Sequence, residues 1–518
     1  MRGHGCGFPQ DPAGATPFGR WNSLLPSGTR STPLERLIRD VPLPSDRSPS
    51  GYFERFGVDG AILASVLDAA LSRGADDADL FFEHAVATRL SVSDGAVNRA
   101  STSVDLGLGV RVVVGDQVGY AFTEVLEPET MREAARIASG IAVSSSPRIR
   151  APFAVRAPLD LYPANRRWDA EGMEARVPLV RGWEEEAFAR DPRVVKVQIS
   201  LLDTERVLLV VRPDGRVVQD HQPMTVASIS CTAEEGGRRE TSSSNVASRS
   251  GREFWDDPTP GREMVEKAVD QTTFLLSAGS PPAGEMPVVL GAGPSGILLH
   301  EAIGHGMEAD FVRKGTSLYG SRVGTRIASE HVTIVDDGTL PHSRGSIGVD
   351  DEGNLPQRTV LVENGVLKGF LHDEISARHF GVAPTGSGRR EGFRHPPLPR
   401  MRVTFMEGGP DDPREIVAGV RRGIYCATFG NGQVQIGAGD FAFYMRTGWL
   451  IEDGRLTRPL KDANLVGNGP MALERITRVG NDLLLDSGGW TCGKQGQGVP
   501  VSHGIPTVLV SSLVVGGA

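Results

Sequence analysis

The chain has 518 residues, of which 39% are hydrophobic and 23% charged, with 64 acidic against 55 basic side chains and a formal net charge of −9. This composition is typical of a globular protein of about two to four domains and excludes a disordered or fibrous chain. The acidic balance disfavours nucleic acid as a partner, and the 64 glycines and 35 prolines predict many turns between strands.

The four cysteines are dispersed along the chain, at Cys6, Cys231, Cys426 and Cys492. They are too few and too widely separated for a secreted disulfide scaffold, which favours a reducing compartment. The sequence has no run of about 18 apolar residues that could span a membrane, and its first residues lack the apolar core of a signal peptide. We therefore expect a cytoplasmic protein without a membrane segment.

Residues 1–56 are rich in Gly, Pro, Ser and Arg and lack hydrophobic periodicity. Such a segment cannot bury enough apolar surface to offset the entropy of ordering, so we expect a flexible N-terminal extension. Apolar residues then recur at helical spacing from Ile62 to Leu71, and Gly74 follows as a stop signal. This pattern predicts the first helix.

Residues 57–283 are expected to form an N-terminal α+β domain, with helices packed on antiparallel sheet. Turn signals such as Gly115-Asp116 and Pro213-Asp214-Gly215 between apolar runs carry this prediction. Strands are expected at Leu80–Val86, Leu90–Val92, Leu106–Val114, Val118–Phe122, Val194–Leu202, Arg206–Val211, Arg216–Gln219 and Thr225–Thr232. Further helices are expected at Glu127–Ala142, Trp183–Ala189 and Pro260–Leu276.

A Ser-Pro-Pro-Ala-Gly segment at 280–284 marks the expected domain boundary. Residues 284–518 are mostly strand-like, so the C-terminal domain is expected to be mainly antiparallel β, curled into a barrel or a sandwich. The expected strands there include His331–Asp336, Thr359–Glu363, Val366–His372 and Trp449–Glu452.

The segment GAGPSG at 291–296 matches the GxGxxG pattern of dinucleotide sites. Such a site also needs a second strand that ends in an acidic residue about 20 residues later. The next predicted strand ends at Asp336, far beyond that distance. The segment is therefore predicted to be a tight turn between a strand and a helix, and a nucleotide-dependent oxidoreductase is the least favoured function.

Four residues further on, His300, Glu301 and His305 form a His-Glu-x-x-x-His pattern. Imidazoles suit zinc, and a carboxylate beside the first one is placed to take a proton from activated water. On a regular α-helix, residues i and i+5 point about 140° apart, so a π-type turn or another distortion is needed before one metal can bind both histidines. Gly304 and Gly306 give the backbone this latitude. The alternative is a pair of surface histidines at a helix end.

Catalytic zinc sites have three protein ligands, so a third donor is needed. Cys492 is the best candidate, because it lies in the glycine-rich stretch GGWTCGKQGQ at 488–497, which is expected to expose the thiol, and Lys494 favours the thiolate. The alternative for Cys492 is a buried, inert cysteine. Cys231 and Cys426 stand in apolar or aromatic strands and are expected to be inert.

Several ordered blocks resemble the TldD/PmbA family of peptidases. They are HEAIGHGMEADF at 300–311, DDGTLPHSRGSIGVDDEG at 336–353, LVENGVLKGFLHD at 361–373, PTGSGRRE at 384–391, VGNDL at 479–483 and CGKQGQGVPVSHGIPT at 492–507. The similarity covers essentially all of 284–518, and ADLFFE at 78–83 and LGVRVVVGDQVGYAF at 108–122 are similar to the family's N-terminal region. The order of the blocks matches the active, TldD-like branch.

The resemblance implies one zinc ion (Zn2+) per catalytic subunit, held by His300, His305 and Cys492, with Glu301 as the catalytic carboxylate. It also implies a dimer, formed with a PmbA/TldE-like paralogue that lacks the metal motif or with a second copy of the chain.

Two features depart from the family pattern. One is the extension at residues 1–56, and the other is His503, which stands where the family often has an apolar residue. We expect His503 to be a solvent-facing loop residue; the alternative is an extra imidazole near the metal site.

The predicted function is zinc-dependent hydrolysis of amide bonds in unfolded or short peptides, as in leader-peptide processing or peptide degradation. Arg389, Arg390 and Glu391 are the candidate substrate-binding residues, because guanidinium groups on a glycine-rich segment can hold a peptide carboxylate or carbonyl. A solvated charged loop is the alternative for them, and sheet edges in the second half can also align an extended peptide. The competing function is a non-catalytic zinc-binding scaffold or regulatory subunit of a peptidase complex.

Overall fold

The computed structural model describes residues 51–142, 147–170, 172–435 and 438–517. Residues 1–50 of the expected flexible extension lie outside the described residues. The expectation is wrong for residues 51–56, because Gly51–Phe56 forms a 3-10 helix in which Tyr52 and Phe53 are buried. The Tyr52 hydroxyl lies 2.7 Å from Nδ1 of His84, so aromatic burial and a hydrogen bond fix this segment on the first strand.

The first half of the chain forms a seven-stranded sheet in the order β3-β2-β1-β5-β6-β4, and β7 also pairs with β6. The pairs are antiparallel except for β4, which runs parallel to β6. The strands are β1 (Asp77–Ser93), β2 (Ala96–Val114), β3 (Gln117–Thr123), β4 (Ala154–Arg156), β5 (Val194–Val211), β6 (Arg216–Glu235) and β7 (Arg238–Ser248).

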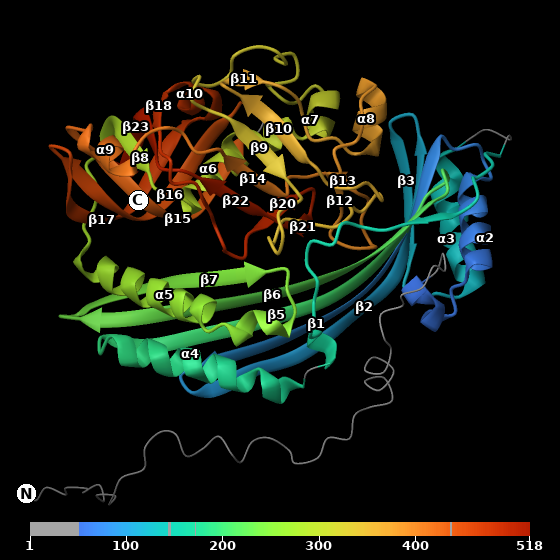
Figure 1. The fold of residues 1–518 in the computed structure, drawn as a ribbon, viewed down its shortest axis with the longest axis horizontal. Helices are drawn as coiled ribbons and strands as arrows, with labels where there is room; N and C mark the ends of the chain where they lie inside the picture. Colours follow the sequence, from blue (N-terminus) through green and yellow to red (C-terminus); the bar gives the residue numbers. More distant parts are fainter. Residues whose placement is uncertain (1–50, 143–146, 171, 436–437, 518) are drawn as a thin grey trace, which may run out of the picture.

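Helices cover one face of this sheet, and the C-terminal half packs against the other face (Figure 1). The helices are α2 (Gly60–Leu71), α3 (Pro128–Ala138), α4 (Val177–Arg190) and α5 (Thr259–Ser277). On β1, Phe82 packs under α2 and α3, and Leu90 packs under α4 and α5. Phe81 points the opposite way, as strand alternation requires, and contacts Phe393 of the C-terminal half. The α+β prediction is therefore confirmed.

The four strands predicted between 194 and 232 are two long ones, β5 and β6, and the two runs predicted in β1 are also one strand. Charged residues inside β5 explain the difference. The Asp203 carboxylate forms a buried ion pair with Arg176, and that of Glu205 pairs with His221. Since these partners lie elsewhere in the chain, the local sequence could not show that the strand continues. The missed strand β7 is rich in Ser and Thr and has little apolar alternation.

Five strands of the C-terminal half close into a barrel in the order β17-β16-β15-β8-β23, because β17 also pairs with β23. The pairs are antiparallel except β8 with β15. The strands are β8 (Gly284–Leu290), β15 (Arg422–Gln435), β16 (Asp440–Glu452), β17 (Arg455–Asn468) and β23 (Val508–Gly517), with β18 (Ile476–Val479) attached to β23. The barrel alternative of the prediction is confirmed, and its first strand starts at the expected boundary.

A second sheet lies beside the barrel, in the order β11-β10-β9-β14-β22-β19, together with two short hairpins. Its strands are β9 (Ile334–Asp337), β10 (Arg358–Glu363), β11 (Val366–Leu367), β14 (Val403–Met406), β19 (Leu484–Leu485) and β22 (Ser502–Ile505). The hairpins are β12 (Gly388–Arg389) with β13 (Leu398–Pro399), and β20 (Thr491–Lys494) with β21 (Gln497–Pro500). Short helices complete this half: α6 (Ile297–Leu299), α7 (Ala309–Arg313), α8 (Glu374–Phe380), α9 (Pro413–Ala418) and α10 (Gly469–Glu474).

The glycine-rich segment after β8 is the tight turn that the sequence predicted. Gly293 has a φ of 84°, a left-handed conformation that favours glycine, and a 3-10 turn at Pro294–Gly296 leads directly into α6. Gly296 lies so close to β22 that an added Cβ would be 2.7 Å from the backbone nitrogen of Gly504. This close approach seats α6 against the barrel core. None of the helices in the described ranges has both the length and the apolar character of a membrane span.

We predict that Gly296→Ala lowers the free energy of unfolding by about 1–3 kcal/mol, because the methyl group forces the α6 turn away from β22. Chemical denaturation measures the difference. Gly369→Ala is the matched control, since a Cβ at that position meets no atom within 4 Å. Equal stability of Gly296→Ala and the wild type would contradict the close packing.

Candidate metal centre

The His-Glu-x-x-x-His motif forms a π-helical turn, His300–Gly304, which continues α6 and is followed by a 3-10 turn at His305–Met307. The N–H of His305 donates to the carbonyl of His300, which is an i→i+5 hydrogen bond. The wider turn holds the two imidazole rings next to each other, with centroids 5.1 Å apart. The distortion required by the spacing is therefore confirmed.

Cys492, in β20, completes a group of three donors. Its Sγ lies 3.5 Å from Nε2 of His305, and one ligand atom from each of His300, His305 and Cys492 lies within 4.8 Å of the others. The expectation of an exposed thiol is wrong, because Cys492 is 3% exposed and packs with Val499 and Val501. The hairpin strand buries the thiol, whereas the sequence suggested an open turn.

The donor set and its spacing fit zinc. Bonds of about 2.3 Å to sulfur and about 2.1 Å to nitrogen at a tetrahedral angle imply an S···N separation of about 3.6 Å. The separation between Cys492 Sγ and His305 Nε2 is 3.5 Å. Thiolate and imidazole are also donors that zinc prefers. His300, His305 and Cys492 therefore form a candidate zinc centre.

A buried carboxylate that sequence reasoning missed supports this centre. Glu308 Oε2 lies 2.9 Å from Nδ1 of His305, on the far side of the ring from Cys492. A carboxylate on Nδ1 fixes the tautomer and orientation that leave Nε2 for a metal. Lys494 Nζ lies 2.9 Å from the same oxygen and 2.6 Å from Oδ1 of Asp310. The position of Glu308, three residues after His305, was the available sequence signal.

Electrostatics favour a thiolate at Cys492. Burial acts to raise the pKa of its thiol, but the adjacent imidazoles of His300 and His305 outweigh burial and lower the pKa to about 4. Burial also acts to raise the pKa of Glu308, and Lys494 and His305 lower it to about 2. Lys494 was expected to act on the thiolate, and its ammonium instead pairs with the two carboxylates beside the site.

The remaining motif residues differ in how they are held. Glu301 lies in the π turn beside His300 and is half-buried. Within the described ranges its carboxylate has no hydrogen-bond or ion-pair partner. His300 is buried, and its Nδ1 has no hydrogen-bond partner there either, so the π turn and the surrounding packing position this ring.

The expectation for His503 is wrong. It is 0% exposed, on β22, and its ring centroid lies 4.9 Å from that of Trp490. Burial lowers its pKa to about 4, which keeps the ring neutral at neutral pH. The cause of its burial is the parallel pairing of β22 with β14, a long-range contact that local sequence does not reveal. Cys231 and Cys426 are buried as expected, and burial raises the pKa of both thiols.

Arg389 and Arg390 are buried and bonded within the chain, which argues against the predicted substrate role. Arg390 Nη2 donates to Oδ1 of Asp79 at 2.8 Å and to the carbonyl of Asp351 at 2.9 Å. Arg389 Nη1 donates to the carbonyl of Met401 at 2.8 Å. The prediction treated these arginines as surface groups because it could not foresee that the N-terminal sheet covers them.

Glu391, the third predicted substrate residue, is exposed. Its Oε2 accepts a hydrogen bond of 2.7 Å from the backbone N–H of Gly498, on the hairpin that carries Cys492. Its substrate-binding role stays a prediction.

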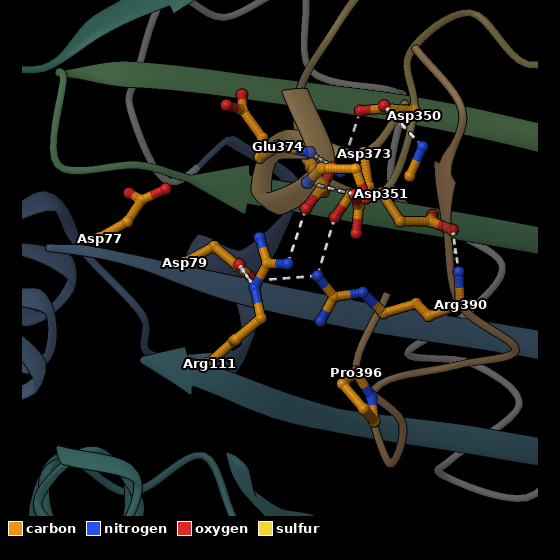
Figure 2. A network of polar contacts seen from close by, with 12 residues as sticks. Asp77, Asp79, Arg111, Asp350, Asp351, Asp373, Glu374, Arg390 and Pro396 are labelled. Carbon is orange, nitrogen blue, oxygen red and sulfur yellow. Dashed lines mark hydrogen bonds and ion pairs between the residues drawn. The ribbon is translucent and has the colours of Figure 1, made fainter. Parts of the chain in front are cut away.

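A buried charge network joins the two halves of the molecule (Figure 2). Arg111 Nε of β2 lies 2.5 Å from Oδ2 of Asp79 in β1, and its Nη1 lies 2.6 Å from Oε1 of Glu352 in the C-terminal half. Arg390 Nη2, also from the C-terminal half, pairs with Oδ1 of Asp79. Burial acts to raise the pKa of Asp79, but Arg111 and Arg390 lower it. The network therefore fixes the N-terminal sheet against the segment 350–391.

The buried His-His-Cys group has the three protein ligands that catalytic zinc sites use, and a glutamate lies in the same turn, which defines a candidate metalloenzyme site. Models described as PmbA/TldA metallopeptidase domain 1, central domain and C-terminal domain match residues 78–142, 168–275 and 283–517. A metalloprotease TldD homolog from Haemophilus influenzae is 38% identical over 461 residues, which cover 88% of this chain and 96% of that protein. The chain belongs to the TldD/PmbA metallopeptidase family.

Three further proteins are similar to this chain. A zinc metalloprotease TldD homolog from Saccharolobus solfataricus is 36% identical over 243 residues, 47% of this chain and 54% of that protein. The solved structure of TldE from Thermococcus kodakarensis has a TM-score of 0.69 at 20% identity, and the match covers 88% of this chain and 100% of the TldE chain. The structure of a DNA gyrase modulator candidate from Thermotoga maritima has a TM-score of 0.72 at 21% identity, and the match covers 88% of this chain and 99% of that chain. Both structures share the fold.

We predict that Glu308→Gln weakens zinc binding about 10- to 100-fold, because the amide orients His305 less firmly and leaves Lys494 with Asp310 as its remaining carboxylate partner. Competition with a chromogenic chelator measures the affinity. Glu363→Gln is the control, since Glu363 pairs with Lys368 at the surface. Unchanged affinity in Glu308→Gln would show that this carboxylate does not support the metal.

We predict that Arg390→Ala lowers the free energy of unfolding by about 3 kcal/mol, because it removes one partner of a buried ion pair. Arg394→Ala is the matched control: Arg394 is 39% exposed and pairs with Glu124, so its loss costs about 1 kcal/mol or less. Denaturation curves of both variants give the comparison. Weakened peptide binding at unchanged stability would instead restore the substrate role of Arg390.

Proposed function

We propose that the protein is a zinc-dependent peptidase that hydrolyses amide bonds in unfolded or short peptides, with one zinc ion per catalytic subunit. The observation that carries this proposal is the convergence of His300, His305 and Cys492 within 4.8 Å, next to Glu301 in the same π turn. Leader-peptide processing and peptide degradation are the two uses that this chemistry serves.

The residues that would hold the ion are His300 in the π turn, His305 at the start of the 3-10 turn that follows it, and Cys492 in β20. Bound zinc supplies Lewis acidity, which polarises the scissile carbonyl and activates water near neutral pH. Glu301 takes the proton from the attacking water and passes it to the leaving amine. Glu308 keeps the His305 ring in one orientation throughout, so the site needs no rearrangement.

The number of donors favours catalysis over the scaffold alternative. Structural zinc sites in proteins are usually closed by four protein ligands, whereas catalytic sites use three. The group found within the described ranges has three members. A partner-free carboxylate beside the ligands also has a use in hydrolysis and none in a purely structural site.

The assembly and the compartment are proposed from the family resemblance and from the cysteines. We propose a dimer with a PmbA/TldE-like paralogue or with a second copy, because the family resemblance implies one. We propose a cytoplasmic location, which agrees with buried free thiols at Cys231, Cys426 and Cys492.

We predict that Glu301→Gln retains zinc but hydrolyses peptides about 100 to 10,000 times more slowly than the wild type, because the substitution removes the group that transfers the proton. Metal analysis gives the zinc content, and mass spectrometry of a digest of unfolded casein gives the rate. Turnover at the wild-type rate would remove Glu301 from the mechanism.

Two controls separate the catalytic and scaffold functions. Cys492→Ala is expected to lose both zinc and hydrolysis, and chelator treatment of the wild type should abolish hydrolysis until zinc is returned. Wild-type protein that binds zinc but cleaves nothing, with or without its paralogue, would favour the scaffold.

A further inference from the structure

A cavity of about 380 Å3 lies where the N-terminal sheet meets the C-terminal barrel. Its walls include Ser242 and Asn245 of β7 on one side and Phe429 of β15 and Arg446 of β16 on the other. The volume falls in the range of about 300–1,000 Å3 that small-ligand sites occupy. The cavity is therefore large enough for one residue of a peptide.

The cavity adjoins the candidate metal centre. Trp490 lines it and also packs against the buried cluster that contains Cys492, two residues further along the chain. Pro294, another lining residue, begins the turn that leads into α6 and His300. An extended chain advances about 3.3 Å per residue. A peptide cleaved at the metal centre can therefore place a residue close to the cleaved bond in this cavity.

The lining carries a surplus of positive charge. Lys267 of α5 and Arg446 face a lining with one acidic residue, Asp486. Both oxygens of Asp486 are already engaged, because Trp490 Nε1 donates to Oδ2 at 2.6 Å and the N–H of Gly488 donates to Oδ1 at 3.1 Å. The carboxylate therefore braces the loop before Cys492, and within the described residues it forms no ion pair with either cation.

The two cations differ in whether a group of the protein already accepts a hydrogen bond from them. One guanidinium N–H of Arg446 donates to the carbonyl of Thr241 in β7, which holds the guanidinium group at the cavity wall. Its other N–H groups remain available to a ligand. Lys267 has no ion-pair or hydrogen-bond partner among the described residues. Apart from the one acidic residue, the other lining residues are neutral, including Ser243 and Ser244 with their hydroxyls. Such a lining is suited to a carboxylate, which accepts charge-assisted hydrogen bonds from both cations.

We propose that this cavity binds a carboxylate of the substrate peptide, an acidic side chain or the C-terminal carboxylate, through Lys267 and Arg446. The inference rests on the proposed peptidase function and names its substrate class: peptides with a negative charge close to the cleaved bond. The local charge matters because the chain as a whole carries −9 and repels such peptides at long range.

The experiment uses zinc-loaded full-length protein and a set of alanine-rich peptides in which one Glu is moved along the chain, each paired with a Gln twin. At one position, the wild type is expected to show a kcat/KM about three to five times higher for Glu than for Gln. In Lys267→Glu the ratio of kcat/KM for the Glu peptide to that for its Gln twin should fall below one. A peptide with Lys at that position should then be cleaved faster than the Gln twin. Lys368→Glu, on an exposed hairpin, is the control and should keep the wild-type ratio. Raised salt should lower the preference.

The two carboxylate sources are separated by comparing free and amidated C-termini. A side-chain preference is unaffected by amidation, whereas a C-terminal preference disappears. A ratio of one at every position and at both kinds of terminus would overturn the proposal, as would a wild-type ratio retained in Lys267→Glu.

Failure of the peptidase function is a different result, namely no cleavage of any peptide. In that case the affinities of the Glu and Gln peptides for the zinc-loaded Glu301→Gln protein, measured by calorimetry, decide the question. Tighter binding of the Glu peptide, lost in a protein that also carries Lys267→Glu, would support the cavity assignment. Equal affinities would overturn it.

Discussion

The candidate metal centre depends on one backbone hydrogen bond, from the N–H of His305 to the carbonyl of His300. In a regular α-helix the two rings would point about 140° apart and could not meet at one ion. The π turn removes this divergence and sets the imidazoles 5.1 Å apart, facing a cysteine 187 residues further along the chain. The turn before α6 and the barrel core around it hold this unusual segment in place.

Charge balance is the second constraint on the site. Glu308 and Asp310 are both buried beside the ligands, and two uncompensated carboxylates there would be costly. Lys494 pairs with both carboxylates from the hairpin that also carries Cys492, and Arg400 lies 4.0 Å from the other oxygen of Glu308. The contact that docks the third ligand therefore also offsets part of this charge. Where the two halves meet, the buried carboxylate of Asp79 is likewise paired, with the guanidinium groups of Arg111 and Arg390 (Figure 2).

The arrangement of the two halves also shapes the surroundings of the centre. The edge strand β7 of the N-terminal sheet and the strands β15 and β16 of the barrel contribute to the lining of the cavity, and the loop before Cys492 lines it too. A contact from Gly489 to the Asn245 side chain ties that loop to β7. The cavity therefore exists because the long strands of the first half extend as far as the barrel.

The sequence by itself identified the candidate ligands and the need for distortion: the spacing of His300 and His305 excludes a regular helix, and the glycine-rich context and the resemblance both favoured Cys492. It also gave the helices, the hairpins and the β-rich second half, because their periodicity and turn residues are local signals. It missed the length of β5 and β6, the burial of Arg390 and His503, and the role of Glu308. Those features were decided by tertiary structure alone, because each is set by partners distant in sequence, and a polar residue has the same local signature whether water or a buried partner satisfies it.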